Sequence, residues 1–540
     1  MRYPNSPQDT GRKTMQSRRD QVQAHGFLMS RLTAGMLTGD SDAPEGPLTR
    51  TTRGVTAGLV MGVLLCAGTF VFGLLRPGGN NSWKTPHTLV VNKDTGARFI
   101  YVDGALRPVR NYASARLIVG PELSSTSVGS TSLKGIPVGG PVGIPGAPDT
   151  VPRLGDLDDA PWRVCIAQGD ATEAARHAPG ARTSLVVGGE SPAEPVGADE
   201  GVVVQGPDKQ KYLVWQGSRL SLDEKSGAAV SLGYGSVAPL TVTSAFLDAL
   251  PAGPALAAPT TPGRGTEGPD IDGHRSRLGE VFQAALPGSE SAQYYLLHKE
   301  GLVAITDTQA AMALGDPRTR EDVYGGTSPK VLAIGADILE KELASDGGGR
   351  ASSTPGAPES PPRPVKVRAG QAACVQVDPG NADRGPRVTA ALAPLDALAH
   401  IAPGQPGEGV TAACLPVDSV VVQPGGGALV HALSAGGVVG DTVYLVADNG
   451  VKYRIPSSEA LKDLGYSPND SESLPSQLLA MLPTGSDLDP MAASGAVKAA
   501  TTPDGCDPDA QRRSTVGAQS PSATKALGPP GPRETAGSTN

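Results

Sequence analysis

The sequence predicts an α+β fold: an N-terminal cytoplasmic helix, one transmembrane helix, and an elongated extracytoplasmic region of four small hairpin-plus-helix repeats around a central β-rich domain. Three observations predict it: a long charge-free run near the N-terminus, an internal repeat further along, and Gly/Pro-rich stretches between the repeated segments. Glycine contributes 70 and proline 50 of the 540 residues, about twice the usual share. This composition favours small folded units separated by long loops.

The run "GVTAGLVMGVLLCAGTFVFGLL" at 54–75 is the predicted transmembrane helix. It is bounded by Arg53 and Arg76, and as a helix it would be about 33 Å long, enough for a ~30 Å hydrocarbon core. A secretory signal has a shorter core nearer the start of the chain, so we interpret the run as an uncleaved anchor. Gly54, Gly58 and Gly62 form a face that permits close helix packing, although glycine is common in membrane helices generally.

Charge is distributed unevenly about this run. Residues 1–53 contain eight Lys/Arg and five Asp/Glu, whereas the whole chain has a net charge of −8. Because basic segments stay in the cytoplasm, we expect the N-terminus inside and the bulk of the chain outside. The acidic bulk argues against nucleic acid as the main partner.

The stretch "QVQAHGFLMSRLTAGML" before the span predicts a basic amphipathic helix. Val22, His25, Met29, Leu32 and Met36 would share one face. The pattern leaves two interpretations open: a helix resting on anionic lipid, or one that docks on a cytoplasmic partner. The candidate docking residues are Arg18, Arg19, Val22, Phe27, Met29, Arg31 and Leu32.

An internal repeat organises the exterior. The segments beginning "YLVWQGSRL" at Tyr212 and "YLVADNGVKYRI" at Tyr444 align without a gap over more than forty residues. Asn449-Gly450 between two apolar runs predicts a β-hairpin, and "PSSEALKDLGY" then predicts a short helix that ends at Gly465. Weaker copies surround Asp103-Gly104 and Gly301, with a helix start at Thr306 or Asp307.

These patterns divide the chain as follows. The predicted segments are 1–53 (cytoplasmic), 54–75 (span), 80–120 (repeat 1), 121–150 (Gly/Pro-rich loop), 151–204 (central domain, first part), 205–258 (repeat 2), 271–317 (repeat 3), 318–435 (central domain, second part), 436–490 (repeat 4) and 491–540 (disordered tail).

The cysteines agree with this topology. Cys66 lies in the span, while Cys165, Cys374, Cys414 and Cys506 lie outside, where disulfides persist. Four cysteines allow three complete pairings, and spacing cannot choose among them. None forms a C-x-x-C motif, so a zinc or redox centre is not indicated.

A search for chemistry identifies no catalytic, cofactor-binding or metal-binding residues. The sequence has no Gly-Lys dipeptide and hence no phosphate-binding P-loop, and it lacks H-E-x-x-H and G-x-S-x-G. "GRGTEG" at 263–268 matches a dinucleotide motif, but no strand precedes it and a proline follows. The acids of "GDLDDAP" fit a solvated turn, and Asp487 and Asp489 align with alanines in the other copy.

The combination of segments resembles the EccB family, membrane components of type VII secretion systems. "SRRDQVQAHGFLMSRLTAGMLTGDSDAPEGPLTR", the span, "PGGNNSWKTPHTLVVNKDTGARFIYVDGALRPVRNYASARLIVG" and "LLAMLPTGSDLDP" carry the resemblance over about residues 15–490. It implies a disulfide that braces the exterior, for which Cys165 and Cys374 are the best-matching positions. Cys414 and Cys506 have no evident counterparts. Family members begin near "MQSRRDQ", so Met15 is an alternative start to Met1.

The resemblance also implies a function. We expect a non-enzymatic structural subunit of a secretion core complex, oligomeric, without cofactors, and built alongside an FtsK-like ATPase and a multi-spanning channel subunit. The alternatives from other classes are a membrane-anchored enzyme that acts on cell-wall material and a receptor that signals through the cytoplasmic helix. Shifted carboxylates or histidines in a pocket would favour the enzyme, and contacts between repeats would favour the scaffold.

Overall fold

The computed structural model describes residues 18–39, 47–75, 83–168, 181–189, 192–285, 292–344, 354–381, 384–395, 398, 407, 409–434 and 438–502. The chain divides into two compact units. The first contains the two N-terminal helices, and the second contains the β-sheets.

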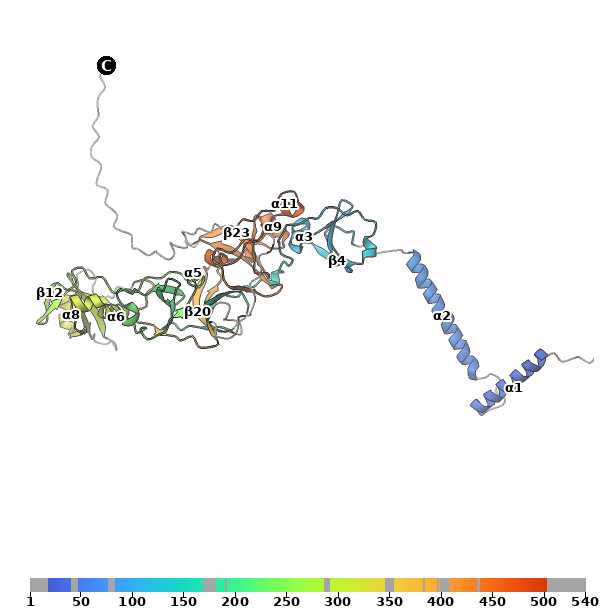
Figure 1. Cartoon of the computed structure of the whole chain (residues 1–540), viewed down its shortest axis with the longest axis horizontal. Coiled ribbons are helices and arrows are strands. Elements are labelled where there is room, and N and C mark those ends of the chain that lie inside the picture. Colours follow the sequence, from blue (N-terminus) through green and yellow to red (C-terminus); the bar gives the residue numbers. More distant parts are fainter. Residues whose placement is uncertain are drawn as a thin grey trace, which may run out of the picture. The chain divides into compact units, whose positions relative to one another are not determined.

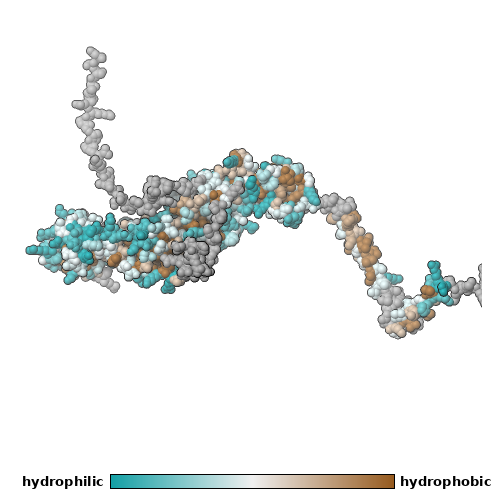
Figure 2. Space-filling model, in the orientation of Figure 1, coloured by the Kyte–Doolittle hydropathy of each residue, from teal (hydrophilic) through white to brown (hydrophobic). Residues whose placement is uncertain are grey.

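The first unit consists of α1 (Arg18–Thr38) and α2 (Pro47–Leu75) (Figure 1). Thr51–Phe72 of α2 is the candidate membrane span. It is 22 residues long with a mean hydropathy of 2.2, and none of it is buried against the rest of the structure. Hydrophobic side chains follow α2 along its length (Figure 2). One helix among the described residues is therefore long and apolar enough to cross a membrane, and it overlaps the predicted range 54–75.

The hydrophobic side chains of α1 extend beyond the face that the sequence predicts. The helix is present, but Phe27 and Met29 point about 200° apart at 100° per residue, and both are more than half exposed. The cause is the consecutive apolar run Phe27-Leu28-Met29, which spreads hydrophobic side chains around the helix instead of along one face.

The second unit contains four sets of four strands, and all four sets have the same strand order. In each, a first strand pairs with a hairpin on one side and with a parallel fourth strand on the other. We call them modules 1 (88–128), 2 (200–248), 3 (281–342) and 4 (427–479).

Module 1 contains β1 (Thr88–Asn92), β2 (Arg98–Val102), β3 (Ala105–Pro108), α3 (Tyr112–Val119) and β4 (Ser124–Val128). Module 2 contains β8 (Glu200–Gln205), β9 (Lys211–Trp215), β10 (Ser218–Ser221), α4 (Ala228–Ser231), β11 (Leu240–Thr241) and α5 (Ser244–Asp248).

The other two modules follow the same plan. Module 3 contains β14 (Val281–Ala284), β15 (Gln293–His298), β16 (Gly301–Ile305), α6 (Asp307–Gly315), α7 (Pro317–Asp322), β17 (Leu332–Ile334) and α8 (Ala336–Glu342), and the hairpin β12 (Glu267–Ile271)–β13 (His274–Arg277) precedes it. Module 4 contains β22 (Gly427–Leu433), β23 (Val439–Ala447), β24 (Lys452–Ile455), α9 (Ser458–Asp463), β25 (Glu472–Pro475) and α10 (Ser476–Leu479), and is followed by α11 (Pro490–Ser494). Short 3-10 turns lie at Ser130–Leu133, Leu154–Asp156 and Pro468–Asp470.

Local chemistry explains the hairpins and the helix starts. Asp103 and Gly104 both have positive φ, 51° and 78°, as a two-residue type I′ turn requires. Thr306 caps α6 through a reciprocal capping box with Gln309, so the helix starts at Asp307. The caps satisfy N–H groups that the helix itself leaves unpaired.

Two predicted segments need correction. The range 121–150 is not all loop, because β4 lies in it and pairs in parallel with β1; its polar sequence "SSTSV" gave no hydrophobic strand signal. The range 491–540 is not disordered from its start, because α11 buries Ala492 and Ala493. The Asp487 carboxylate also accepts a hydrogen bond from the Thr502 hydroxyl at 2.7 Å.

A six-stranded central sheet joins distant parts of the chain. Its order is β21 (Ser419–Val422), β6 (Ala181–Val187), β5 (Trp162–Gln168), β19 (Gln371–Asp378), β20 (Arg387–Pro394) and β7 (Glu194–Pro195). One hydrophobic cluster contains Val164 and Val375 of this sheet, Phe246 of module 2 and Leu474 of module 4. The central sheet therefore packs against both modules.

The modules also pack in pairs through their helices. Ala113 and Leu117 of α3 share a core with Leu461 of α9 and Ala493 of α11, and these three helices lie together in Figure 1. Met312 of α6 joins the core of module 2. Module 1 thus contacts module 4, and module 2 contacts module 3.

Candidate functional site

The disulfide lies in the middle of the central sheet. Cys165 of β5 and Cys374 of β19 are direct cross-strand partners, and they are bonded to each other across 209 residues of sequence. Both are buried on the opposite face from Val164 and Val375. A bond that closes so long a loop restricts the unfolded chain strongly. Cys414 is also disulfide-bonded, while Cys66 is free on α2.

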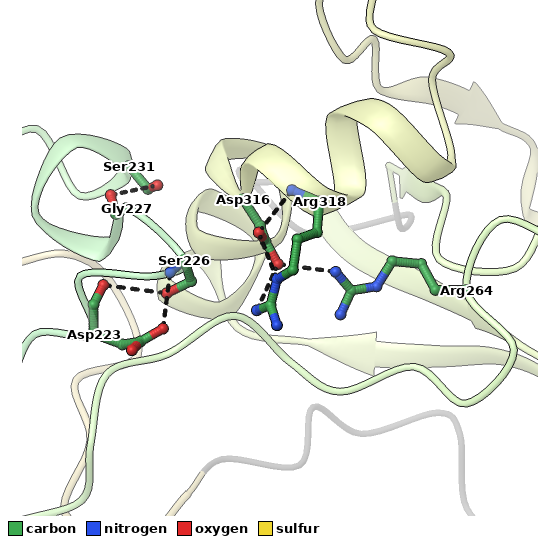
Figure 3. A network of polar contacts seen from close by, with 7 residues as sticks. All are labelled: Asp223, Ser226, Gly227, Ser231, Arg264, Asp316 and Arg318. Carbon is green, nitrogen blue, oxygen red and sulfur yellow. Dashed lines mark hydrogen bonds and ion pairs between the residues drawn. The ribbon is translucent and has the colours of Figure 1, made fainter.

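A buried charge network lies in module 3, beside its joint with module 2 (Figure 3). Asp316 is fully buried at the start of α7, and its carboxylate accepts hydrogen bonds from Arg264 at 2.9 Å and Arg318 at 3.1 Å. The Arg318 backbone N–H donates to the same carboxylate at 3.0 Å. A buried carboxylate is costly unless it is paired and hydrogen-bonded, and these three contacts meet that need.

Arg318 also interacts electrostatically with Asp223, an acid of module 2. Hydrogen bonds from Ser226 and the charge of Arg318 lower the pKa of Asp223, although partial burial opposes the shift. Pairing with Asp316, with a smaller effect from Asp223, raises the pKa of Arg318. The arginine therefore interacts electrostatically with both modules.

Helices α4 and α6 approach closely beside this network. A Cβ added at Gly315 would lie 2.0 Å from the Ser231 hydroxyl oxygen, which itself donates to the Gly227 carbonyl at 3.0 Å. Met312, one turn earlier, is almost fully buried. The approach therefore requires glycine at 315.

Residues 354–364, here called the strap, cross this joint. The Thr308 N–H donates to the Glu359 carbonyl at 3.0 Å, and the Ser360 hydroxyl donates to Asp307 at 2.8 Å. On module 2, the Tyr234 hydroxyl donates to the Pro362 carbonyl at 2.8 Å, and β18 (Arg363–Pro364) pairs with β8. Burial raises the pKa of Tyr234 to about 12. The strap thus binds both modules.

The joint between modules 1 and 4 is built differently. The joint has a shared apolar core and several hydrogen bonds. Arg116 donates to the Leu464 carbonyl at 2.8 Å, and the Gly143 N–H donates to the Ala493 carbonyl at 2.9 Å. The Tyr466 hydroxyl donates to the Pro152 carbonyl at 2.6 Å. These polar contacts use backbone carbonyls as acceptors.

One carboxyl group of module 4 is strongly perturbed. Burial, together with the charges of Asp159 and Asp158, raises the pKa of Glu472 to about 7. Its Oε2 atom is buried and has no hydrogen-bond partner among the described residues. Among those residues, no group of three or more His, Cys, Asp or Glu side chains is arranged to hold a metal ion.

The sequence-predicted membrane and docking residues lie in the first unit. On α1, Val22, Phe27, Met29 and Leu32 are exposed, and the Arg31 guanidinium lies 5.7 Å from the centre of the Phe27 ring; Arg18 and Arg19 are exposed at its start. On α2, Gly58 and Gly62 line a shallow open groove with Cys66 and Phe70. A Cβ at Gly54, Gly58 or Gly62 would meet no described atom within 4 Å.

Sequence reasoning missed the Asp316 network and Glu472. Asp316-Pro317 is a recognisable helix start, since Asp favours the cap and Pro the first turn. That signal predicts α7, but not the burial of the carboxylate or its arginine partners. For Glu472 no local signal exists, because its pKa depends on burial in the fold and on acids more than 300 residues away.

Together these features define a membrane-anchored protein with one candidate span and a multi-module β-rich region held together by a disulfide and helix-mediated joints. Residues 14–501 match the family model described as "Type VII secretion system ESX-1, transport TM domain B" (EccB). The chain belongs to this EccB family of type VII secretion proteins.

Relatives and solved structures agree with this membership. The chain is 29% identical to ESX-3 secretion system ATPase EccB3 of Mycolicibacterium smegmatis, over 82% of this chain and 83% of that protein. It is 25% identical to ESX-1 secretion system ATPase EccB1 of Mycobacterium tuberculosis, over 83% and 88%. The fold is similar to that of EccB3 in a dimer from the ESX-3 core complex, with a TM-score of 0.57 and 25% identity over 75% of this chain and 99% of that one. A chain of an intact ESX-5 inner membrane complex has a similar fold, with a TM-score of 0.56 over 91% and 98% and 23% identity.

Proposed function

We propose that the chain is a non-enzymatic structural subunit of a type VII secretion membrane core complex, supporting protein export across the cytoplasmic membrane. The observation that carries the proposal is the family match over residues 14–501, which takes in the span and all four modules. The basic N-terminal segment supports a cytoplasmic N-terminus with the modules outside.

The exterior is proposed to be an elongated body of four repeats around a central domain. The common strand order of the four modules supports this. The pairing of module 1 with 4 and of module 2 with 3 would present their outer surfaces to other subunits, and a scaffold needs such shape-specific surfaces instead of a tuned active site.

The partners are proposed to be an FtsK-like ATPase, a multi-spanning channel subunit, other core components and further copies of this chain. The exposed apolar and basic side chains of α1 would dock on cytoplasmic partners, and Gly54, Gly58 and Gly62 would pack in the membrane. A relative's structure as a dimer supports self-association, and such assemblies usually close by symmetry.

The word ATPase in the names of relatives does not change this proposal. Nucleotide hydrolysis by a P-loop requires a lysine after a glycine-rich turn, and this sequence has no Gly-Lys dipeptide. We propose that ATP hydrolysis in the complex belongs to a partner subunit.

Affinity purification from mild detergent tests the docking role. The tagged full chain should bring down an ATPase subunit and a multi-spanning subunit, and deletion of residues 18–37 should remove the ATPase. Replacing Val22, Met29 and Leu32 with serine should weaken recovery of the ATPase, whereas replacing the polar Gln21 and Gln23 with serine should not. Recovery of the chain alone, or with cell-wall enzymes, would contradict the proposal.

A further inference from the structure

A small cavity lies where three segments of the second unit meet. Residues 255–259 leaving module 2, the first turns of α6 and residues 354–358 of the strap form its walls, and its volume is about 110 Å³. A single water needs roughly 10–15 Å³ by this kind of measure, and an engineered cavity of about 150 Å³ in another protein holds benzene. The space therefore suits a molecule of about four to six non-hydrogen atoms.

The lining of the cavity is uncharged and amphipathic. Leu256, Met312 and Pro358 are buried apolar contributors, while Thr306, Gln309 and Thr354 contribute polar groups. None of the lining side chains is ionisable. A charged occupant would lose its hydration without gaining a counter-charge, so the chemistry favours a neutral one.

Thr308 supplies the second, independent observation. It lines the cavity and is 1% exposed, and its hydroxyl oxygen is buried with no hydrogen-bond partner among the described residues. The Thr308 N–H already donates to the Glu359 carbonyl, and Thr306 and Gln309 form the capping box at the start of α6. The unmet group is thus a hydroxyl, which can both donate and accept a hydrogen bond, and leaving it unpaired is costly.

We propose that this cavity is a binding site for a small neutral molecule that carries at least one hydroxyl group. Thr308 is its hydrogen-bonding partner, and Leu256 and Met312 contact its apolar side. The walls come from residues 255–259, which follow module 2 and share its core through Leu256, from α6 of module 3 and from the strap. The bound molecule therefore holds the three segments together and makes the joint between modules 2 and 3 responsive to a ligand.

Ligand-observed NMR on the full chain in detergent tests the site, with propane-1,2-diol, five non-hydrogen atoms, as the probe. The wild type should show saturable binding in the millimolar range, the scale expected for so small a ligand. Thr308→Val removes only the hydroxyl and should weaken binding about tenfold, or ~1.4 kcal/mol. Thr308→Ser keeps the hydroxyl and should bind nearly as well as the wild type.

Two further variants locate the binding. Ala357→Leu places a larger side chain in the cavity wall and should abolish binding, and it also tests the site if Thr308→Val fails to fold. Thr241→Val changes an exposed threonine on β11 that does not line the cavity and should bind as the wild type does.

Three results would overturn the inference. If the wild type shows no saturable binding, the cavity holds water alone. If Thr308→Val and Ala357→Leu bind the probe as well as the wild type does, binding is elsewhere. If acetate, of similar size but charged, binds as tightly as the diol, the assignment to a neutral ligand is wrong.

Discussion

The two joints between modules solve the same packing problem with different chemistry. Modules 1 and 4 share an apolar core in which Leu117 and Leu461 are almost completely buried, although they lie far apart in sequence. Modules 2 and 3 meet where Met312 and Ala311 of α6 pack on the core of module 2, beside the buried carboxylate of Asp316, which is held by two arginines. Apolar burial is nondirectional, whereas an ion network depends on each of its partners.

The two joints should therefore lose stability in different ways. The apolar joint should lose stability in proportion to the volume removed from it. The polar joint should fail abruptly when Asp316 is removed, because Arg264 is then left largely buried without its partner. Substitutions in each joint separate these two behaviours.

The largest loss is expected for Asp316→Ala. It removes the helix cap of α7 and leaves Arg264, whose side chain is only 15% exposed, without its partner. Breaking a buried pair costs about 3–5 kcal/mol, to be measured as a shift in chemical denaturation of the full chain. Asp322→Ala, at an exposed acid on the same helix, should change stability by less than about 0.5 kcal/mol; equal losses in both variants would contradict the account.

In the apolar joint, Leu117→Ala should cost about 2–4 kcal/mol, because α3 loses a buried side chain and leaves a cavity. The loss should be the same at low and high salt. Val230→Ala, at a side chain that is 73% exposed on α4, is the matched control. A salt-dependent loss at Leu117 would show that charges hold this joint as well.

A smaller effect is expected for Gly315→Ala. The new methyl group would overlap Ser231, and overpacking of this kind costs about 1–3 kcal/mol. The double variant Gly315→Ala with Ser231→Gly removes the opposing side chain and should recover part of that loss, since the backbone Cα of residue 231 stays 3.0 Å from the new Cβ. Gly155→Ala, where the added Cβ meets no described atom within 4 Å, serves as the control, and failure of the double variant to recover would refute the close approach of α4 and α6.

The smallest effect concerns pH. Since the pKa of Glu472 is raised to about 7 in the folded protein, the folded chain holds this proton where the unfolded chain has lost it. Stability should therefore fall as pH rises from about 4.5 to about 7 and then level off. Because the side chain is only partly buried, we expect on the order of 1 kcal/mol.

The variant Glu472→Gln should flatten that part of the stability–pH profile, measured by thermal unfolding between pH 4 and pH 8. Glu459→Gln, at an exposed position on α9, should leave the profile as it is in the wild type. A profile for Glu472→Gln that still falls across this range would remove Glu472 as its cause.

The sequence predicted the parts of the fold that local chemistry determines. Asp103-Gly104 marks a turn because both residues adopt positive φ, and Asn449-Gly450 marks one because Gly450 does. Thr306 marks a helix start because its hydroxyl can cap the first turn. The polar strand Ser124–Val128 carried no such signal, since its place beside β1 comes from tertiary pairing.

The joints could not be predicted for the same reason. The burial of Asp316 depends on Arg264, 52 residues away, and the contact of Leu117 with α9 joins residues more than 300 positions apart. The pairing of Cys165 with Cys374 was available only from the family resemblance, because four external cysteines allow three pairings. The disulfide in the structure joins that pair.

The most direct test of the central claim, that this subunit is structural, is ATP hydrolysis by the purified full chain, free of other secretion subunits, in detergent with Mg²⁺. The account predicts a rate no higher than that of a mock purification from cells that lack the chain, and a clear rate only when the partner ATPase is added. Hydrolysis that co-purifies with the chain alone, and that a substitution within the chain abolishes while the protein stays folded, would contradict the account and make the subunit an enzyme.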